Sequence, residues 1–349
     1  MSSSEGVLKY RLGNWELQSG QVIPNAEIAY KTFGDASSPS IIYPTWFSGA
    51  IADNEWLIGD DKALNPQKYY IIIPALFGNA QHKLVTEHLG ITHARAVLGW
   101  SMAASQAYQW VTQYPDFVDL AIPFCGAAKV SIHNTVFLES LKGALLAVKK
   151  QCTAGACKGG FLAPGEYRTW SAEEKDVGLK AFGRVYAGWG FSQTFYRQKI
   201  YESVLGFKGL EDFLVNFWEK WATSKDPENL LAMVYTWQAA DCSKQEPYNG
   251  DFRAAMQAIK AKMLVLPGKT DLYFPPEDSE IEVENMREGV GKMMVIPSVW
   301  GHWAGGPGGS LEDVQWLDER LREFGLGDVQ GIDEQLKELS LRPLPKSKL

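Results

Sequence analysis

The stretch from Ala94 to Tyr114 constrains the fold most, because a serine flanked by small residues joins a short apolar run to a helical pattern. Gly99 stands two positions before Ser101, and Ala103 stands two positions after it. Small side chains at these positions allow a sharp turn between a buried strand and a helix, with the serine hydroxyl exposed at the bend. The usual pattern has a second glycine after the serine, but the single methyl group of alanine can still pack against the strand. The stretch therefore predicts a strand, a tight turn and a helix, in that order.

Strand and helix patterns alternate near both ends of the chain. Strands are expected at 9–15, 26–32, 41–43, 68–76, 94–98, 118–124, 263–266 and 293–296, and helices at 81–89, 102–114, 276–288 and 311–324. Such alternation is typical of parallel strands joined by helices that cover both faces of the sheet. The sequence thus predicts an α/β fold with a doubly wound, mostly parallel sheet.

The middle of the chain breaks this alternation. Residues 134–251 have a helical pattern and are crowded with tryptophan, tyrosine and phenylalanine. An insertion of this length usually forms a cap over the strand ends, where ligands bind. We expect residues 1–133 and 252–325 to form the α/β core and 134–251 to form a helical lid, whose aromatic side chains mostly pack on one another. Residues 326–349 are expected to form a C-terminal tail.

The composition excludes several classes of partner. The 349 residues carry a net charge of -7, so no excess of basic residues is present to bind nucleic acid or an anionic membrane surface. No apolar run approaches the length of a membrane-spanning helix. The cysteines and histidines show no metal-binding spacing, and we therefore expect no metal.

A nucleophilic serine needs a histidine base, and the order along the chain selects one. In a fold with this turn, the serine is followed by an aspartate or glutamate and then by the histidine. Only His133 and His302 follow Ser101, and His133 is too close to leave room for the acid and the strands between them. His302 directly follows the last expected strand, which makes it the predicted base. A histidine with a purely structural role is the alternative.

The acid is expected in the loop after the strand at 263–266. Asp271 stands there and would accept a hydrogen bond from the imidazole, which fixes the tautomer and stabilises the protonated ring. Its rivals are Asp241, Asp251 and Asp278, for which capping of a helix or exposure to solvent is the better interpretation.

Acyl transfer also requires donors for the negative charge that develops on the carbonyl oxygen. The backbone N–H of Met102, the residue after the serine, is one expected donor. The second is expected in the loop after the strand at 41–43, where Trp46 is our choice and Thr45 and Phe47 are its alternatives.

These segments carry a family resemblance that covers about residues 10–324. The chain resembles the homoserine O-acetyltransferase-like branch of the α/β-hydrolase superfamily. The matching segments are 99–103 (GWSMA), 114–118 (YPDFV), 126–137 (GAAKVSIHNTVF), 271–276 (DLYFPP) and 301–302 (GH). The resemblance implies the α/β-hydrolase fold with an inserted helical lid, a triad of Ser101, Asp271 and His302, and often a homodimer. A fainter similarity is to peroxisomal hydrolases of fungal toxin pathways.

Three features depart from this branch. True acetyltransferases resemble Gly-Gly-Ser-Met-Gly-Gly at the turn, whereas this chain has Gly-Trp-Ser-Met-Ala-Ala. They also carry a lid arginine that binds the carboxylate of the amino acid substrate. Arg184 is the nearest match, offset by one residue, and a solvated lid arginine is the alternative. Relatives have a longer loop where this chain has only the residues from Gly78 to Gln81, so either the cleft is more open or the chain lacks a segment.

Three functions fit these residues. The leading prediction is a serine hydrolase that cleaves an ester or thioester through an acyl-enzyme. The alternative is an acyl-CoA-dependent O-acyltransferase, in which an alcohol intercepts the same acyl-enzyme. The third is a non-catalytic binding protein on the same fold. The apolar lid and the turn sequence favour hydrolysis, and no cofactor is expected, although acyl-CoA would be a substrate in the second case.

The last three residues, Ser347-Lys348-Leu349, form a peroxisomal targeting signal that an import receptor reads. An accidental match is the alternative. Charged residues and prolines precede the signal at 333–345, which would keep it exposed. We expect a peroxisomal protein, and a cytoplasmic one if the match is accidental.

Overall fold

The computed structural model describes residues 6–17, 20–76, 80–149, 170–307 and 309–327. The predicted targeting signal at 347–349, Gly78 of the short loop and almost all of the predicted tail lie outside these ranges. Targeting through the import receptor therefore stays a prediction.

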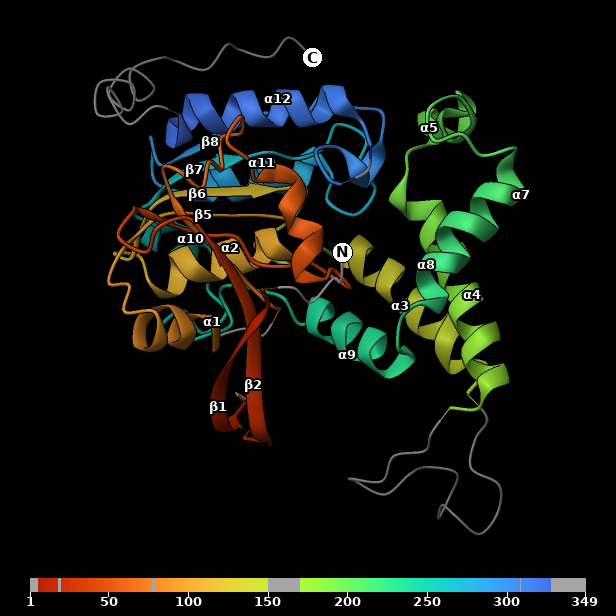
Figure 1. Cartoon of the computed structure of the whole chain (residues 1–349), viewed down its shortest axis with the longest axis horizontal. Helices are drawn as coiled ribbons and strands as arrows, with labels where there is room; N and C mark the ends of the chain where they lie inside the picture. The colour runs from red at the N-terminus through yellow and green to blue at the C-terminus, as the bar shows by residue number, and fades with distance from the viewer. Residues whose placement is uncertain (1–5, 18–19, 77–79, 150–169, 308, 328–349) are drawn as a thin grey trace.

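Within the described residues, the core is built around an eight-stranded sheet (Figure 1). Its strands are β1 (Leu8–Glu16), β2 (Val22–Phe33), β3 (Ser40–Ile42), β4 (Tyr70–Pro74), β5 (Ala94–Trp100), β6 (Val118–Phe124), β7 (Lys262–Val265) and β8 (Gly291–Met293). Their order across the sheet is β1-β2-β4-β3-β5-β6-β7-β8. The pairs β1/β2 and β2/β4 are antiparallel, and all other neighbouring strands are parallel.

Consecutive residues of the central strands point to opposite faces of the sheet. Ile41 and Leu98 belong to the core beneath η1 and α12, whereas Ile42 and Val97 pack against α2 and α10. Both faces are buried, which explains why these strands are apolar throughout. The predicted doubly wound, mostly parallel α/β sheet is confirmed. The core helices are η1 (Ile51–Leu57), α1 (Ala80–Lys83), η2 (Leu84–His88), α2 (Met102–Gln113), α10 (Phe252–Ala258), α11 (Pro276–Asn285), η5 (Gly301–Trp303), α12 (Leu311–Leu321) and η6 (Arg322–Leu326).

The last strand differs from the predicted one at 293–296, because β8 ends at Met293. Hydrogen bonds continue beyond it, from the N–H of Met294 to the carbonyl of Val265 (3.0 Å) and from the N–H of Ile296 to the carbonyl of Pro267 (2.9 Å). Pro267 has no N–H with which to return a bond, so the regular ladder breaks there.

The lid helices occupy the chain between β6 and β7. They are α3 (Ile132–Leu146), α4 (Ala172–Gly190), α5 (Gln193–Arg197), α6 (Ile200–Ser203), α7 (Leu210–Phe213), η4 (Leu214–Glu219), α8 (Lys220–Thr223) and α9 (Pro227–Gln238). In Figure 1, α4, α5, α7 and α8 stand beside the core, and α3 packs against both α4 and α9. The interior of the lid is largely aromatic. No helix among the described residues combines the length and apolar character that crossing a membrane requires.

The lid and the core meet along a tight seam. The hydroxyl of Ser192 donates to the carbonyl of Val299 (2.5 Å). Gly301 has φ +63°, and a Cβ at this position would lie only 2.7 Å from the backbone nitrogen of Ser192. Glycine is required here both by the close approach and by the positive φ. The lid backbone therefore lies directly against the loop that contains His302.

Candidate active site

Three loops at the same edge of the sheet bring the predicted site residues together. Ser101 follows β5, Asp271 stands in the loop after β7, and His302 lies in η5 after β8. These strands are parallel, so their carboxyl ends meet at one edge, which is where α/β proteins place their ligands.

The turn at Ser101 is strained and is held by two close contacts. Ser101 has φ 60° and ψ -129°, a conformation that costs a residue with a side chain about 1–3 kcal/mol. A Cβ at Gly99 would lie 2.4 Å from the Cβ of Ala103, and one at Gly126 would lie 2.5 Å from the carbonyl oxygen of Ser101. The two glycines thus allow the strand, the turn and α2 to approach closely enough to fix the serine.

A continuous chain of hydrogen bonds links the three side chains. Nε2 of His302 lies 2.9 Å from Oγ of Ser101, and Nδ1 lies 2.7 Å from Oδ2 of Asp271. The carboxylate can only accept, so Nδ1 carries a hydrogen in the neutral ring and Nε2 is free to accept the serine proton. This is the arrangement that a serine nucleophile and its base require.

The carboxylate of Asp271 is held from its other side by the backbone. Its Oδ1 accepts the N–H groups of Tyr273 (2.8 Å) and Phe274 (3.2 Å). Two of its rivals have other roles: Asp251 caps α10, and Asp241 binds Lys129 and the backbone N–H of its own turn. Only Asp271 among these residues contacts His302.

The three side chains are enclosed. Ser101 is 3% exposed, Asp271 3% and His302 2%. Water is thus largely excluded from the hydrogen-bonded chain, which strengthens its electrostatic interactions.

Trp100, which no sequence motif marks as a site residue, contacts His302 in two ways. Its ring stacks on that of His302, with 4.8 Å between centroids and 25° between planes. Its Nε1 also donates to the carbonyl of His302 (3.0 Å). Trp46 packs edge-on against Trp100, with 5.0 Å between ring centroids. The signal in the sequence was the tryptophan at a place where the resembling branch has glycine.

The loop after β3 offers a second N–H for an oxyanion. The N–H of Thr45 donates to the carbonyl of Pro74 (3.1 Å), which removes Thr45 from the alternatives. Within the described residues, the N–H groups of Trp46 and Met102 have no acceptor in the protein. The N–H of Phe47 has none either. Trp46 and Met102 therefore stay the predicted pair.

Two buried side-chain amides, which no sequence motif indicates, hold the loop after β3. Nε2 of Gln106, on α2, donates to the carbonyl of Thr45 (2.9 Å). Nδ2 of Asn54, on η1, donates to the carbonyls of Tyr43 (3.0 Å) and Pro44 (2.9 Å). These bonds fix the direction of the loop carbonyls and so of the N–H groups between them.

An aromatic chamber lies beside Ser101 and His302. We use this name for the side chains of Phe47, Phe137, Tyr186, Trp237, Tyr273 and Phe274, which form one buried cluster with Met102. The ring centroid of His302 lies 4.4 Å from that of Tyr273 and 5.6 Å from that of Phe274. The chamber is therefore in direct contact with His302.

Arg184 does not contact the other predicted site residues. Its Nε binds Glu219 (2.5 Å), and its two terminal nitrogens bind Glu211 (3.2 and 2.5 Å). All three nitrogens are thus engaged by carboxylates of the lid. Its predicted role in binding substrate would require an exchange of these ion pairs.

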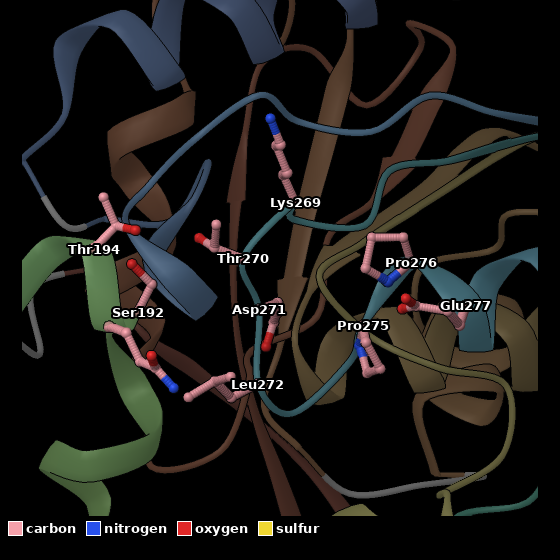
Figure 2. Close-up of a pocket in the computed structure, with 10 residues that line it drawn as sticks. Ser192, Thr194, Lys269, Thr270, Asp271, Leu272, Pro275, Pro276 and Glu277 are labelled. Atoms are coloured by element: carbon pink, nitrogen blue, oxygen red, sulfur yellow. The ribbon is translucent and has the colours of Figure 1, made fainter. Parts of the chain in front are cut away.

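A cavity of about 360 Å³ lies at the seam and is lined in part by the loop that contains Asp271. Figure 2 shows Ser192 and Thr194 of the lid facing Thr270 and Asp271 of the core. Neither Ser101 nor His302 lines this cavity. Within the described residues, no group of three His, Cys, Asp or Glu side chains could hold a metal ion.

Two other buried titratable groups lie near the sheet. Burial raises the pKa of the Cys125 thiol well above its ordinary value, so this cysteine stays protonated and is a poor nucleophile. Burial also raises the pKa of Glu282 to about 8. Its oxygens accept from the hydroxyl of Tyr108 and the N–H of Ala128, both at 2.6 Å.

Comparison with known proteins identifies relatives of this architecture. No family profile matches the chain. It is 32% identical over 326 residues to a probable esterase of Corynebacterium glutamicum, covering 83% of this chain and 88% of that protein. It is also 32% identical over 299 residues to an ethyl acetate hydrolase of Pseudomonas veronii, covering 76% and 81%. A solved acetylester hydrolase from Corynebacterium glutamicum has a TM-score of 0.79 and 30% identity, covering 91% of this chain and 95% of that one. Homoserine O-acetyltransferases, at 21% and 24% identity, are more distant relatives.

The fold and the arrangement of the three loops define the chain as an α/β hydrolase. Within that superfamily it belongs to the esterase family that these relatives represent, in the homoserine O-acetyltransferase-like branch. It is an enzyme of the hydrolase or acyltransferase kind, and the prediction of an ester hydrolase is confirmed at this level. The alternative of a non-catalytic binding protein is wrong.

Proposed function

We propose that the chain is a serine esterase that cleaves short-chain carboxylic esters through an acyl-enzyme on Ser101. The observation that carries this proposal is the buried chain of hydrogen bonds from Ser101 through His302 to Asp271. The names of the relatives, which include an ethyl acetate hydrolase and an acetylester hydrolase, support the same substrate class.

The residues divide the reaction into two steps. Oγ of Ser101 attacks the ester carbonyl while Nε2 of His302 takes its proton, and the protonated ring then gives that proton to the leaving alcohol. In the second step, His302 takes a proton from water, which attacks the acyl carbonyl; the bond to Oγ then breaks, the carboxylic acid leaves, and the protonated ring returns its proton to Oγ of Ser101. Asp271 keeps Nδ1 protonated and stabilises the imidazolium in both steps. The N–H groups of Trp46 and Met102 bind the oxyanion.

The aromatic chamber favours a short acyl or alcohol group. Its rings already pack closely: Phe137 stacks on Tyr273 with 4.7 Å between centroids, and Phe47 lies 5.8 Å from Tyr186. A long chain would have to displace several buried rings, whereas an acetyl or ethyl group needs little space.

Kinetics with a series of ethyl esters tests this proposal. We expect kcat/KM to fall by about 10-fold or more from ethyl acetate to ethyl octanoate, because each displaced ring loses its packing. The Ser101→Ala variant should lose activity and labelling by a fluorophosphonate, while the wild type is labelled. Full labelling of this variant, or faster cleavage of octanoate than of acetate, would contradict the proposal.

Acyl transfer is the second candidate, favoured by the enclosed serine, since a site without water lets an alcohol intercept the acyl-enzyme. Its substrate would be an acyl-CoA thioester. Incubation with acetyl-CoA in the presence and absence of alcohols separates the two functions. Hydrolysis predicts that free acetate exceeds the transferred ester, and the opposite ratio would favour the transferase.

A further inference from the structure

Two polar atoms in the aromatic chamber have no partner. Nε1 of Trp237 and the hydroxyl oxygen of Tyr273 are buried, and no residue that the structure describes forms a hydrogen bond with either. Leaving such a group unpaired in the interior costs about 1–3 kcal/mol. Native proteins keep few unpaired groups of this kind, and those they keep ask for an explanation.

Both donors lie between the base and the oxyanion loop. The ring of Tyr273 is 4.4 Å from that of His302. Trp237 stands near the end of the lid helix α9. Its ring centroid lies 5.8 Å from that of Tyr273 and 5.7 Å from that of Phe47, the residue after Trp46. An ester whose carbonyl lay between His302 and the N–H of Trp46 would bring its neighbouring atoms close to this region.

Among the residues that the structure describes, none accepts a well-aligned hydrogen bond from either donor. Two apolar rings stack on them, that of Phe137 on Tyr273 and that of Phe274 on Trp237. Tyr186 lies close enough to Tyr273 to influence the pKa of its hydroxyl, but the two side chains do not form a well-aligned hydrogen bond. The carboxylate of Asp271 is already engaged by His302 and by two backbone N–H groups. A bound ligand could therefore supply the hydrogen-bond acceptor for Trp237 and Tyr273.

We propose that the N–H of Trp237 and the O–H of Tyr273 form a polar subsite for a hydrogen-bond-accepting oxygen of the substrate. The preferred substrates are then short esters that carry an ether or carbonyl oxygen in addition to the ester group. This inference rests on the proposed esterase function and narrows its substrate class.

Two pairs of esters of nearly equal shape test the subsite. Butyl acetate is compared with 2-methoxyethyl acetate, and ethyl butanoate with ethyl methoxyacetate; in each pair one methylene becomes an ether oxygen. We expect the wild type to favour the ether of one pair by about 10-fold in kcat/KM, since an unpaired buried donor is satisfied only by that ester. The first pair reports an acceptor in the alcohol, and the second reports one in the acyl group.

Variants assign the preference to the two donors. Trp237→Phe and Tyr273→Phe should each lower the ratio of kcat/KM within that pair by about 3-fold or more. Trp218→Phe is the matched control, because its Nε1 is equally buried and unpaired but it packs on Phe191 and Trp303 instead of His302. This control should keep the ratio of the wild type.

Three results would overturn the subsite. They are equal cleavage within both pairs by the wild type, an unchanged ratio in both variants, or a Tm for Tyr273→Phe that is several degrees lower, which would mean that the hydroxyl is bound within the protein. All three leave ester hydrolysis itself intact. If none of the four esters is cleaved and no fluorophosphonate label is taken up, the proposed function fails as well.

Discussion

Replacing Asp271 by asparagine should abolish catalysis almost completely while leaving the fold intact. The structure fixes how the new amide must lie. Oδ1 accepts the N–H groups of Tyr273 and Phe274, so the amide oxygen takes this place and the NH2 group faces Nδ1 of His302. An NH2 group can only donate, so Nδ1 becomes the acceptor and the hydrogen moves to Nε2. Nε2 then points its hydrogen at Ser101 and cannot take the serine proton.

The expected loss follows from this exchange of tautomers. A base in the wrong tautomer lowers kcat by about 10⁴-fold in serine enzymes, which is about 5.5 kcal/mol in the activation free energy. The assay is the hydrolysis of ethyl acetate at pH 7, followed by titration of the released acid. Thermal unfolding of the same variant shows whether the fold is kept.

Asp241→Asn is the matched control. Asp241 is also buried and accepts a backbone N–H, that of Ser243 (2.9 Å), but it pairs with Lys129 and does not contact His302. Its kcat should stay within about 3-fold of the wild-type value, as for a residue outside the site. An Asp271→Asn variant that is folded and retains more than about one hundredth of the wild-type kcat would refute the tautomer argument.

Three further predictions concern the turn, the base and a buried acid. Gly99→Ala should destabilise the fold by about 1–3 kcal/mol or more, because the new Cβ would lie 2.4 Å from the side chain of Ala103. Gly188→Ala, at an exposed helix position with open space around it, should instead stabilise the fold by about 0.5–1 kcal/mol. Urea unfolding measures both changes, and equal effects would contradict the packing argument. Trp100→Phe removes the N–H that holds the carbonyl of His302 and should lower kcat by about 10-fold, with KM nearly unchanged in steady-state kinetics; a normal kcat would exclude this positioning role. Burial raises the pKa of Glu282 from 4.5 to about 8, so the folded chain holds this proton more tightly than the unfolded chain, and the free energy of unfolding should fall as pH rises from about 4.5 to about 8. Glu282→Gln should remove this decrease in the free energy of unfolding, which is on the order of a few kcal/mol. A variant whose stability in urea titrations varies with pH as the wild type's does would contradict this assignment to Glu282.

The meeting of Ser101, Asp271 and His302 could be predicted from the sequence because local and topological rules both act on these residues. The small residues around Ser101 report a tight turn, and the order of serine, acid and histidine follows from the order of the strands. A parallel sheet then brings their loops to one edge. Nothing beyond the chain itself is needed for this inference.

Contacts between distant elements could not be predicted in the same way. The N–H of Thr45 is occupied by the carbonyl of Pro74, which leaves Trp46 as the expected oxyanion donor. No local sequence pattern predicts this hydrogen bond. The ion pairs of Arg184 with Glu211 and Glu219 likewise join separate lid helices. The closeness of Trp237 to Tyr273, from a lid helix and a core loop, also depends on how the lid docks. Such pairings emerge only when the whole chain has folded.

The contact between Gly301 and the backbone of Ser192 has a consequence for engineering by segment exchange. With no side chain between the two backbones, a helical insert grafted from a related protein would fit only if its own turn matched this approach to within a few tenths of an ångström. Chimaeras should therefore carry residues 190–192 and 299–303 as one unit, whichever parent supplies them.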